Sequence, residues 1–348
     1  MSASPQHRLK LPHAPRIMVR MPNWIGDAVM ATPALMAVRT TFPEARIVVV
    51  ANPLVAELFS FHPDCDQIIR FDKNSSHHGF RGFWQFCRSL RGERFDLAIL
   101  LQNAIEAAVM ALLAGIPRRA GYRTDGRGVL LTHGVAAVDK KHGLHHVDYY
   151  LRMLSQLGIE DGSGRLSLAL TPDEKSRAAD QLGSGAWVAV NPGASYGAAK
   201  RWIPERFAAV ADRLAAEFGV RIVLTGGPGE TEIGRDIEQA MQSAPLNLIG
   251  RTSVRELMAT LAHCRLVVTN DSGPMHIAAA FGVPIVAVFG PTDHTTTSPR
   301  ADSCRIVRVP ADCAPCMLRE CPTDHRCMNG VTAEMVLAAA RELWERAR

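Results

Sequence analysis

Apolar residues occur along this chain in short runs that are separated by stretches with helical spacing. In the first half, the apolar, β-rich runs predict strands at residues 16–20, 46–51, 67–71 and 96–101. The spacing of apolar positions between them predicts helices at residues 27–42, 53–60, 83–90 and 104–115. Strands that alternate with helices predict a parallel sheet covered by helices on both faces.

The second half repeats this pattern. Predicted strands lie at residues 186–191, 221–225, 246–250, 265–271 and 284–290, and predicted helices at residues 205–219, 231–242, 253–264 and 273–282. Two such halves predict an α/β protein with two doubly wound parallel sheets and a cleft between them. Ligands of such folds bind beyond the carboxyl ends of the strands.

The same pattern sets the expected domain organisation. We expect a disordered tail at residues 1–15, a first domain at 16–170 and a second at 171–330. A polar stretch from Ile159 to about Gly185 is the expected linker. The last helix, within 331–348, is expected to pack back toward the first domain.

Composition narrows the class of protein. With 348 residues, 47% hydrophobic and 21% charged, the chain resembles an ordinary globular protein and is neither intrinsically disordered nor fibrous. No run of about 18 apolar residues is present, and the N-terminal stretch lacks the apolar region of a secretory signal. These features lead us to expect a cytoplasmic protein.

The charge is unevenly distributed. The net charge is +5, with a balance of +6 in residues 1–170 and −1 in the rest. The basic half is expected to meet an anionic partner: nucleic acid, a lipid headgroup or a sugar phosphate. Simple solubility is the alternative explanation.

The loop after the first strand carries Asp27, which follows Gly26 at the start of a helix. An aspartate in this position commonly caps the helix. However, this loop is the first strand-to-helix crossing and faces the expected cleft. A carboxylate there can also act as a general base toward a hydroxyl group.

A second candidate site lies at residues 265–282. A strand ends in Asn270 and Asp271, Ser272 and Gly273 then open a helix, and His276 lies in its first turn. Free backbone N–H groups and the helix dipole make such an end an anion site, and a pyrophosphate is the natural guest. Ordinary capping by Asp271 or Ser272 is the alternative.

Two further loops follow strands of the second half. In TGGPGETE, Glu230 or Glu232 could bind a ribose hydroxyl or cap a helix, and neither a dinucleotide fingerprint nor a Walker sequence is present. In the other loop, Lys200 could neutralise a diphosphate, although a lone lysine is usually solvent-exposed.

Two cysteine-containing patterns suggest metals. The Asp64-Cys65-Asp66 triplet resembles a DxD metal motif, but it precedes a strand and so lies away from the expected cleft. Cys313, Cys316, Cys321 and Cys327 have the spacing C-x2-C-x4-C-x5-C. Four thiolates could hold zinc, with His325 as an alternative ligand, or the cysteines could simply be reduced.

Taken together, these motifs resemble the ADP-heptose:lipopolysaccharide heptosyltransferases of glycosyltransferase family 9, most like its heptosyltransferase II members. The segments that carry the resemblance are PNWIGDAVMATPAL, NPGASYGAAKRW, TGGPGE, NDSGPMHIAAAFGVPIVAVFGPTDHTTTSP and the cysteine tail. They span about residues 16–345, nearly the whole chain. The type II assignment rests on PNWIGD and on the cysteine tail.

The resemblance implies a GT-B fold, with two facing Rossmann-like domains, and an inverting transfer of L-glycero-D-manno-heptose from ADP-heptose. The acceptor would be the first heptose of the lipopolysaccharide inner core on Kdo₂-lipid A. The first domain would bind this acceptor and the second ADP-heptose. Neither a cofactor nor a metal is expected.

The resemblance also implies roles for individual residues. Asp27 would be the catalytic base. The donor-binding residues would be Ser195, Lys200, Glu230, Asp271, Ser272, Gly273 and His276. The acceptor-binding residues would be Asn23, Trp24, Arg119 and Arg123.

An anionic acceptor would also account for the basic first half, which we expect to dock at the cytoplasmic face of the inner membrane in peripheral contact. Further basic candidates are Arg127, Lys140 and Lys141.

Other functions remain open at this point. One is heptosyltransferase I activity directly on Kdo₂-lipid A, and another is a sugar-nucleotide epimerase of the same architecture. A non-catalytic nucleotide-sugar-binding module would bind donor without turnover. A nucleic-acid binder is disfavoured because the basic residues are not interleaved with aromatics and no known module is present.

Overall fold

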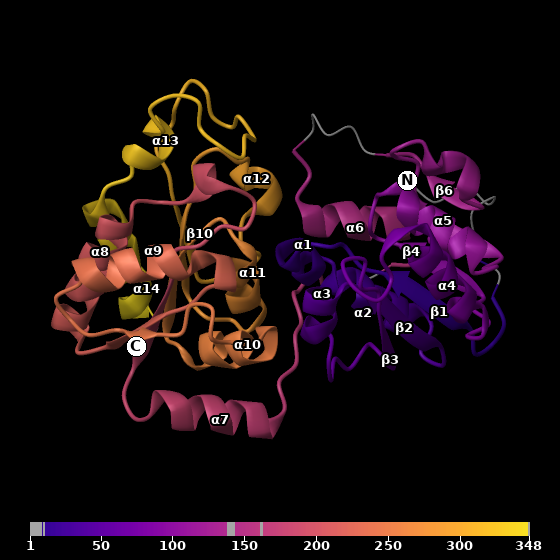
Figure 1. Cartoon of the computed structure of the whole chain (residues 1–348), viewed down its shortest axis with the longest axis horizontal. Coiled ribbons are helices and arrows are strands. Elements are labelled where there is room, and N and C mark those ends of the chain that lie inside the picture. Colours follow the sequence, from indigo (N-terminus) through magenta and orange to yellow (C-terminus); the bar gives the residue numbers. More distant parts are fainter. Residues whose placement is uncertain (1–8, 10, 138–142, 161–162, 347–348) are drawn as a thin grey trace. The chain divides into compact units, whose positions relative to one another are not determined.

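The computed structural model divides into two units, Met1–Ala169 and Leu170–Arg348, and each contains one sheet (Figure 1). It describes residues 9, 11–137, 143–160 and 163–346. Most of the predicted tail at 1–15 lies outside the described residues. The division between the units falls one residue before the expected boundary.

The first unit has six parallel strands in the order β3-β2-β1-β4-β5-β6. The strands are β1 (Arg16–Arg20), β2 (Arg46–Ala51), β3 (Gln67–Arg70), β4 (Leu97–Leu100), β5 (Arg118–Tyr122) and β6 (His133–Val135). The helices are α1 (Ile25–Met30), α2 (Thr32–Thr41), α3 (Pro53–Leu58), α4 (Gly79–Arg91), α5 (Ile105–Leu113) and α6 (His146–Ser155), with a 3₁₀ turn η2 (Arg127–Leu130).

The second unit repeats this topology in the order β12-β11-β10-β7-β8-β9, again with parallel pairing between the neighbours. Its strands are β7 (Trp187–Asn191), β8 (Arg221–Leu224), β9 (Leu246–Asn247), β10 (Leu266–Asn270), β11 (Ile285–Val288) and β12 (Cys304–Val307). Its α-helices are α7 (Pro172–Leu182), α8 (Pro204–Phe218), α9 (Thr231–Ala240), α10 (Val254–His263), α11 (Gly273–Ala280), α12 (His294–Thr297), α13 (Arg326–Asn329) and α14 (Ala333–Arg346).

The central strands of both sheets are fully buried because helices cover both faces. Every residue of β4, β7 and β10 is buried. This explains why each of them contains a run of consecutive apolar residues rather than an alternating pattern. In both sheets the strand order reverses between the first strand and the fourth, which is the position where doubly wound folds bind ligands. The prediction of two doubly wound α/β units is therefore confirmed.

Several elements differ from the predictions. The helix expected at 27–42 is divided into α1 and α2, with Pro33 in the first turn of α2. The expected linker contains α7, which begins with a capping box between Thr171 and Glu174. The strands β5, β6 and β12 were not predicted because their sequences lack a continuous apolar run.

The last helix belongs to the core of the second unit. Val336, Leu337, Ala340 and Leu343 of α14 are buried in the core cluster of the second unit, together with residues of α8, β10 and β11. The helix therefore packs on the second sheet. Its apolar stripe has the spacing of a core-facing helix, which does not reveal the sheet that it covers.

Candidate functional site

Asp27 lies where the strand order of the first sheet reverses. It follows β1 and is the third residue of α1. The N-cap position of this helix is Trp24, whose side chain makes no capping hydrogen bond. Asp27 lies in the first turn of α1 and does not occupy the N-cap position.

The carboxylate of Asp27 contacts a histidine side chain. Its Oδ1 lies 2.9 Å from Nδ1 of His146, the first residue of α6. The two side chains are 27% and 39% exposed, so the pair is accessible from solvent. His146 is not among the candidate residues that the motifs indicated. The histidines at 142, 145 and 146 in the basic half were the only signal for it.

Two expected acceptor-binding residues, Asn23 and Trp24, immediately precede α1. The Asn23 side-chain oxygen accepts a hydrogen bond from the Arg20 guanidinium at 3.1 Å, and its backbone carbonyl accepts one from Asn52 at 2.8 Å. Burial lowers the pKa of Arg20 to about 10. Asn23 is thus held in place, whereas the Trp24 side chain is 49% exposed at the same edge of the sheet.

The expected basic residues are not equivalent in the structure. Arg119 is the second residue of β5, and its guanidinium donates to the carbonyls of Ile116 and Leu130 at 2.7 Å each. It therefore lies toward the amino end of its strand, away from the edge that carries Asp27. Arg123 follows the carboxyl end of β5 and is exposed.

Arg127 has a structural role. It is fully buried, and its guanidinium donates to the carbonyl oxygens of Tyr122 and Gln102 and to the side chain of Asn103. Burial lowers its pKa to about 10. Arg127 is therefore not a surface contact for an anion, contrary to the prediction. Lys140 and Lys141 lie outside the described residues.

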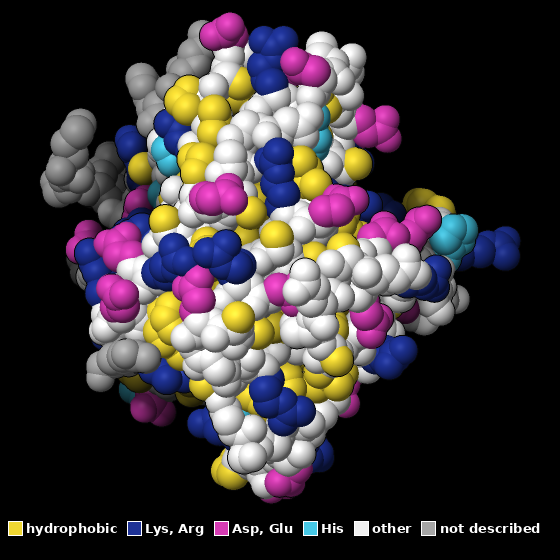
Figure 2. Space-filling view, turned by 90° about the vertical axis from the view of Figure 1, so that its left-hand side faces the viewer, with side chains coloured by type: hydrophobic (Ala, Val, Ile, Leu, Met, Phe, Trp, Pro, Cys, Tyr) yellow, Lys and Arg dark blue, Asp and Glu magenta, His cyan; other side chains and the backbone are white. Residues whose placement is uncertain are grey.

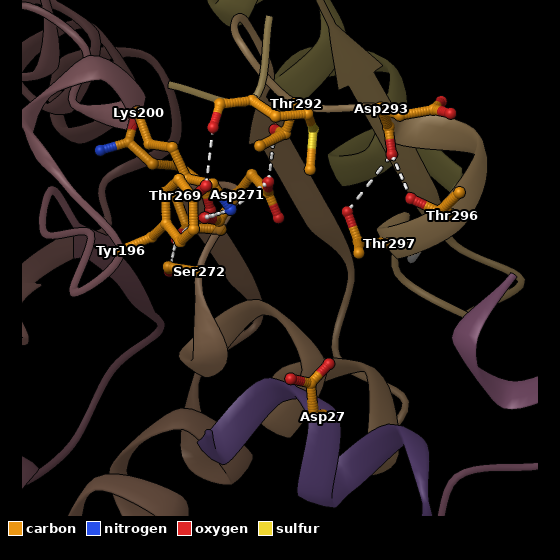
Figure 3. A network of polar contacts seen from close by, with 12 residues as sticks. Asp27, Tyr196, Lys200, Thr269, Asp271, Ser272, Thr292, Asp293, Thr296 and Thr297 are labelled. Atoms are coloured by element: carbon orange, nitrogen blue, oxygen red, sulfur yellow. Dashed lines mark hydrogen bonds and ion pairs between the residues drawn. The ribbon is translucent and has the colours of Figure 1, made fainter. Parts of the chain in front are cut away.

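In the second unit, the structure brings Lys200 and Asp271 together (Figure 3). Lys200 Nζ lies 2.6 Å from Asp271 Oδ2, and the same oxygen accepts a hydrogen bond from Thr292 at 2.6 Å. The side chains of Lys200 and Asp271 are 12% and 5% exposed. Lys200 is thus a fixed, mostly buried cation at the carboxyl edge of the sheet, not a solvated surface lysine.

The N-terminus of α11 lies beside this pair. Ser272 precedes the helix, and its side chain makes no capping hydrogen bond. Its hydroxyl donates to Asn191 Oδ1 at 3.2 Å. It also contacts Thr269 Oγ1 (Figure 3). Pro274, the second residue of α11, has no N–H, and the N–H of Met275 donates to the Ser272 carbonyl at 3.2 Å. Among the first three residues of the helix, the N–H of Gly273 is therefore the group that can meet an anion. His276 is buried within α11.

Glu230 and Ser195 occupy neighbouring loops of the second sheet. The Glu230 carboxylate accepts a hydrogen bond from Gly227 N at 2.7 Å, and burial raises its pKa. An added Cβ at Gly193 would lie 1.9 Å from that carboxylate, so a larger residue there would displace the Glu230 side chain. Ser195 is exposed on the same loop as Gly193, as is Glu232 on α9.

The cysteine segment, residues 313–327, supports the loop that carries Lys200. Tyr196 donates its hydroxyl to the Met317 carbonyl at 2.7 Å, and Lys200 Nζ lies 5.0 Å from the centre of the Tyr196 ring. The Ala199 amide donates to the Arg319 carbonyl at 2.9 Å. The contacts with Met317 and Arg319 join residues more than 100 positions apart and could not be predicted from local sequence.

All eight cysteines are free thiols. Burial raises the pKa of Cys327, and the nearby Cys313, Cys321 and Cys316 raise it further. Among the described residues, no three His, Cys, Asp or Glu side chains are grouped so that they could hold a metal ion. Across all the residues that the structure describes, no helix is both long and apolar enough to cross a membrane.

Comparison with known families gives a match over most of the chain. The sequence model of glycosyltransferase family 9 (heptosyltransferase) matches residues 83–326. Lipopolysaccharide heptosyltransferase 2 of Escherichia coli is 31% identical over 84% of this chain and 88% of its own length. Lipooligosaccharide heptosyltransferase 2 of Campylobacter jejuni is 30% identical over 94% of this chain and 98% of its own length.

Comparison with solved structures gives a consistent result. The structure of the E. coli ADP-heptose lipopolysaccharide heptosyltransferase II aligns with a TM-score of 0.82 at 28% identity. The alignment covers 95% of this chain and 99% of that one. The likeness therefore extends over both units and confirms the prediction of the GT-B fold.

Proposed function

Because the chain belongs to glycosyltransferase family 9, the heptosyltransferases, we propose that it transfers heptose from ADP-heptose to the first heptose of the lipopolysaccharide inner core. The observation that carries this proposal is the similarity to heptosyltransferase 2 along nearly the whole chain, in sequence and in structure. Asp27 in the first unit, and Lys200 with Asp271 in the second, lie at the carboxyl edges of their sheets, where such folds bind ligands. This supports the same activity.

Asp27 is the general base of the proposed reaction. Its carboxylate takes the proton of the acceptor hydroxyl as that oxygen attacks the anomeric carbon of the donor, and the bond to ADP breaks with inversion. His146 contacts one carboxylate oxygen and leaves the other for the acceptor hydroxyl. A base must lie within hydrogen-bonding distance of the proton that it removes, and this solvent-accessible carboxylate can meet that condition.

The diphosphate of the donor binds at the start of α11 and beside Lys200. As the sugar leaves, negative charge accumulates on the departing ADP. A fixed ammonium group and the N-terminus of a helix both stabilise that charge. Asp271 and Thr292 hold Lys200 in place rather than contacting the phosphates themselves. We assign the carboxylate of Glu230 and the hydroxyl of Ser195 to the nucleoside part, because their loops follow neighbouring strands at the same edge of the sheet.

Asn23, Trp24 and Arg123 are the proposed acceptor contacts in the first unit. Trp24 and Arg123 are exposed at the carboxyl edge that carries Asp27, whereas Asn23 is held there by Arg20. Arg119 is withdrawn from the acceptor site because it lies toward the amino end of β5. The acceptor is a glycolipid, so we expect the enzyme to work in peripheral contact with the cytoplasmic face of the inner membrane.

The decisive experiment compares two acceptors with purified protein and ADP-heptose. We expect ADP release and a heptosylated product with heptosyl-Kdo₂-lipid A, and none with Kdo₂-lipid A. Turnover of only the unheptosylated acceptor would instead indicate heptosyltransferase I activity. Conversion of the sugar nucleotide without acceptor would indicate an epimerase, and donor binding without any turnover would indicate a binding module.

A further inference from the structure

Helix α4 of the first unit has a filled inner face and an apolar, basic outer face. Phe86, Cys87 and Leu90 are buried in the core cluster beneath it. On the opposite side of the helix, Phe80 lies in the first turn and Trp84 about one turn later. Their side chains are 80% and 42% exposed. Exposed apolar side chains that lie next to one another, rather than singly, are typical of interaction surfaces. This face is therefore a candidate docking surface.

The charges on this face all have the same sign. Arg88 follows Trp84 by one turn, and its guanidinium lies 5.5 Å from the centre of the Trp84 ring. Arg81, next to Phe80, is also exposed. Residues 73–92 contain four Lys or Arg and no Asp or Glu. By contrast, the face of the second unit drawn in Figure 2 mixes acidic and basic side chains.

These four residues form one continuous strip. Phe80, Trp84 and Arg88 are spaced four residues apart and so lie on one side of the helix, and Arg81 flanks them. At 1.5 Å per residue, the strip is about 12 Å long. We refer to Phe80, Arg81, Trp84 and Arg88 as the α4 strip.

The α4 strip begins near the edge of the sheet that carries the candidate base. Helix α4 follows β3, so its first turn lies near the carboxyl edge of the first sheet, the edge that also carries Asp27. Ile105, the first residue of α5, is 49% exposed at the same edge. Next to it, Glu106 forms an ion pair with Lys73 from the segment that leads into α4.

We propose that the α4 strip is a membrane-docking surface whose partner is a bilayer of anionic phospholipid. Aromatic side chains partition into the interface between headgroups and acyl chains, while arginines place their charge among lipid phosphates. Each Lys or Arg near an anionic surface contributes roughly a fivefold gain in binding. The inference deepens the proposed function, because a glycolipid acceptor is presented in such a bilayer.

Vesicle sedimentation tests the proposal without either substrate. We expect the full chain to sediment with vesicles of phosphatidylethanolamine and phosphatidylglycerol at low salt, and weakly with phosphatidylcholine alone. The variants Phe80→Ser/Trp84→Ser and Arg81→Glu/Arg88→Glu should each reduce binding at least about tenfold. All four side chains are exposed, so both variants should keep the wild-type melting temperature and circular dichroism spectrum.

Matched controls lie on the second unit. Arg235→Glu/Arg251→Glu reverses two exposed arginines, and Met335→Ser removes an exposed apolar side chain. Both variants should sediment like the wild type. With detergent-solubilised acceptor, where no bilayer is present, the strip variants should keep the wild-type kcat/KM.

Three results would overturn the proposal. The first is that the wild type does not bind phosphatidylglycerol vesicles. The second is that the strip variants bind them as well as the wild type does. The third is that binding requires glycolipid acceptor in the vesicles. The last result would make the strip part of acceptor recognition. Failure of heptose transfer would reject the proposed function while leaving the vesicle result intact, so the two failures are distinguishable.

Discussion

The contact between Asp27 and His146 sets the geometry of the candidate base, because one carboxylate oxygen is engaged and the other is not hydrogen-bonded to His146. Asp27→Asn preserves the size of the side chain and its ability to contact His146 but removes its basicity. We expect kcat to fall by about 10²–10⁴-fold with the fold intact, the usual effect of losing a general base. Initial rates at saturating donor and acceptor measure this.

Asp125→Asn is the matched control for that variant. Asp125 is exposed after β5, and its positive φ of 50° is one that asparagine tolerates. Its rate should equal that of the wild type. Near-wild-type turnover of a folded Asp27→Asn enzyme would rule out Asp27 as the base.

Lys200 offers a second test at the scale of single residues. Lys200→Ala removes a fixed cation and leaves the Asp271 carboxylate without its ion-pair partner. We expect ADP affinity to fall by about 10–100-fold, because a charge-assisted hydrogen bond is lost and the remaining carboxylate repels phosphate. Calorimetric titration with ADP measures the change.

The exposed Lys175 of α7 provides the control, and Lys175→Ala should bind ADP like the wild type. The double variant Lys200→Ala/Asp271→Asn separates the two contributions to the loss. Recovery of part of the affinity would identify the repulsion from Asp271. Unchanged ADP affinity and kcat in Lys200→Ala would remove Lys200 from the donor site.

At the scale of elements, one ion pair fixes α7 to α10. Two nitrogens of Arg255 contact the Glu174 carboxylate, and both side chains are about nine-tenths buried. The Arg255 hydrogen bond, with the amide and side chain of Thr171, lowers the pKa of Glu174 to about 2. The pair therefore secures α7, the first helix of the second unit.

Glu174→Gln should destabilise the protein by about 3 kcal/mol at pH 7, because the substitution leaves Arg255 without its carboxylate partner. The folded-state pKa lies below the ordinary value of 4.5. The stabilisation is therefore present above pH 4.5 and is lost as the pH falls toward 2. Denaturant unfolding at several pH values measures this.

The exposed Asp324–Arg326 pair is the comparison for the Glu174 variant. Asp324→Asn should change the free energy of unfolding by less than about 1 kcal/mol, as is usual for surface ion pairs. If Glu174→Gln had an equally small effect, or an effect that did not diminish in acid, the pair would not secure α7.

At the scale of the whole molecule, the excess positive charge of the first half is less concentrated than its sequence suggested. Of its candidates for acceptor binding, Arg127 is buried and Arg119 bonds to backbone carbonyls, while Arg123 remains exposed. Arg123→Glu should raise the KM for acceptor and leave the KM for ADP-heptose nearly unchanged. Steady-state kinetics with each substrate varied in turn measures this.

Salt gives the same test without a substitution. The Debye length falls from about 10 Å at 0.1 M to about 3 Å at 1 M, so the KM for acceptor should rise more steeply with salt than the KM for donor. Arg46→Glu, at the start of β2 and exposed, is the control at the opposite edge. Equal effects of salt and of Arg123→Glu on both substrates would mean that the positive charge serves only solubility.

Much of the fold could be predicted from the sequence because its signals are local. Buried strands such as β1, β7 and β10 are short apolar runs, and helices such as α8 show apolar residues at helical spacing. Parallel pairing follows from the alternation of the two. Strands β5, β6 and β12 escaped prediction because charged residues or glycine interrupt their short apolar segments, and α7 did so because most of its residues are polar.

The same distinction applies to the residues of the candidate site. Asp27, Lys200, Asp271 and the start of α11 could be identified by sequence, because residues that follow strands of a parallel sheet gather at one edge. Their partners could not be identified. His146 is 119 residues from Asp27, and Met317 is 121 residues from Tyr196. Such contacts depend on how whole elements pack.

The sequence by itself thus determined the two α/β units, the family resemblance and the loops that carry the chemistry. Tertiary structure alone decided which charges are available. It paired Lys200 with Asp271, buried Arg127, left Arg123 exposed and placed α14 on the second sheet. The reason is physical: periodicity reports only whether a residue faces a core, whereas burial and pairing depend on neighbours that lie far away along the chain.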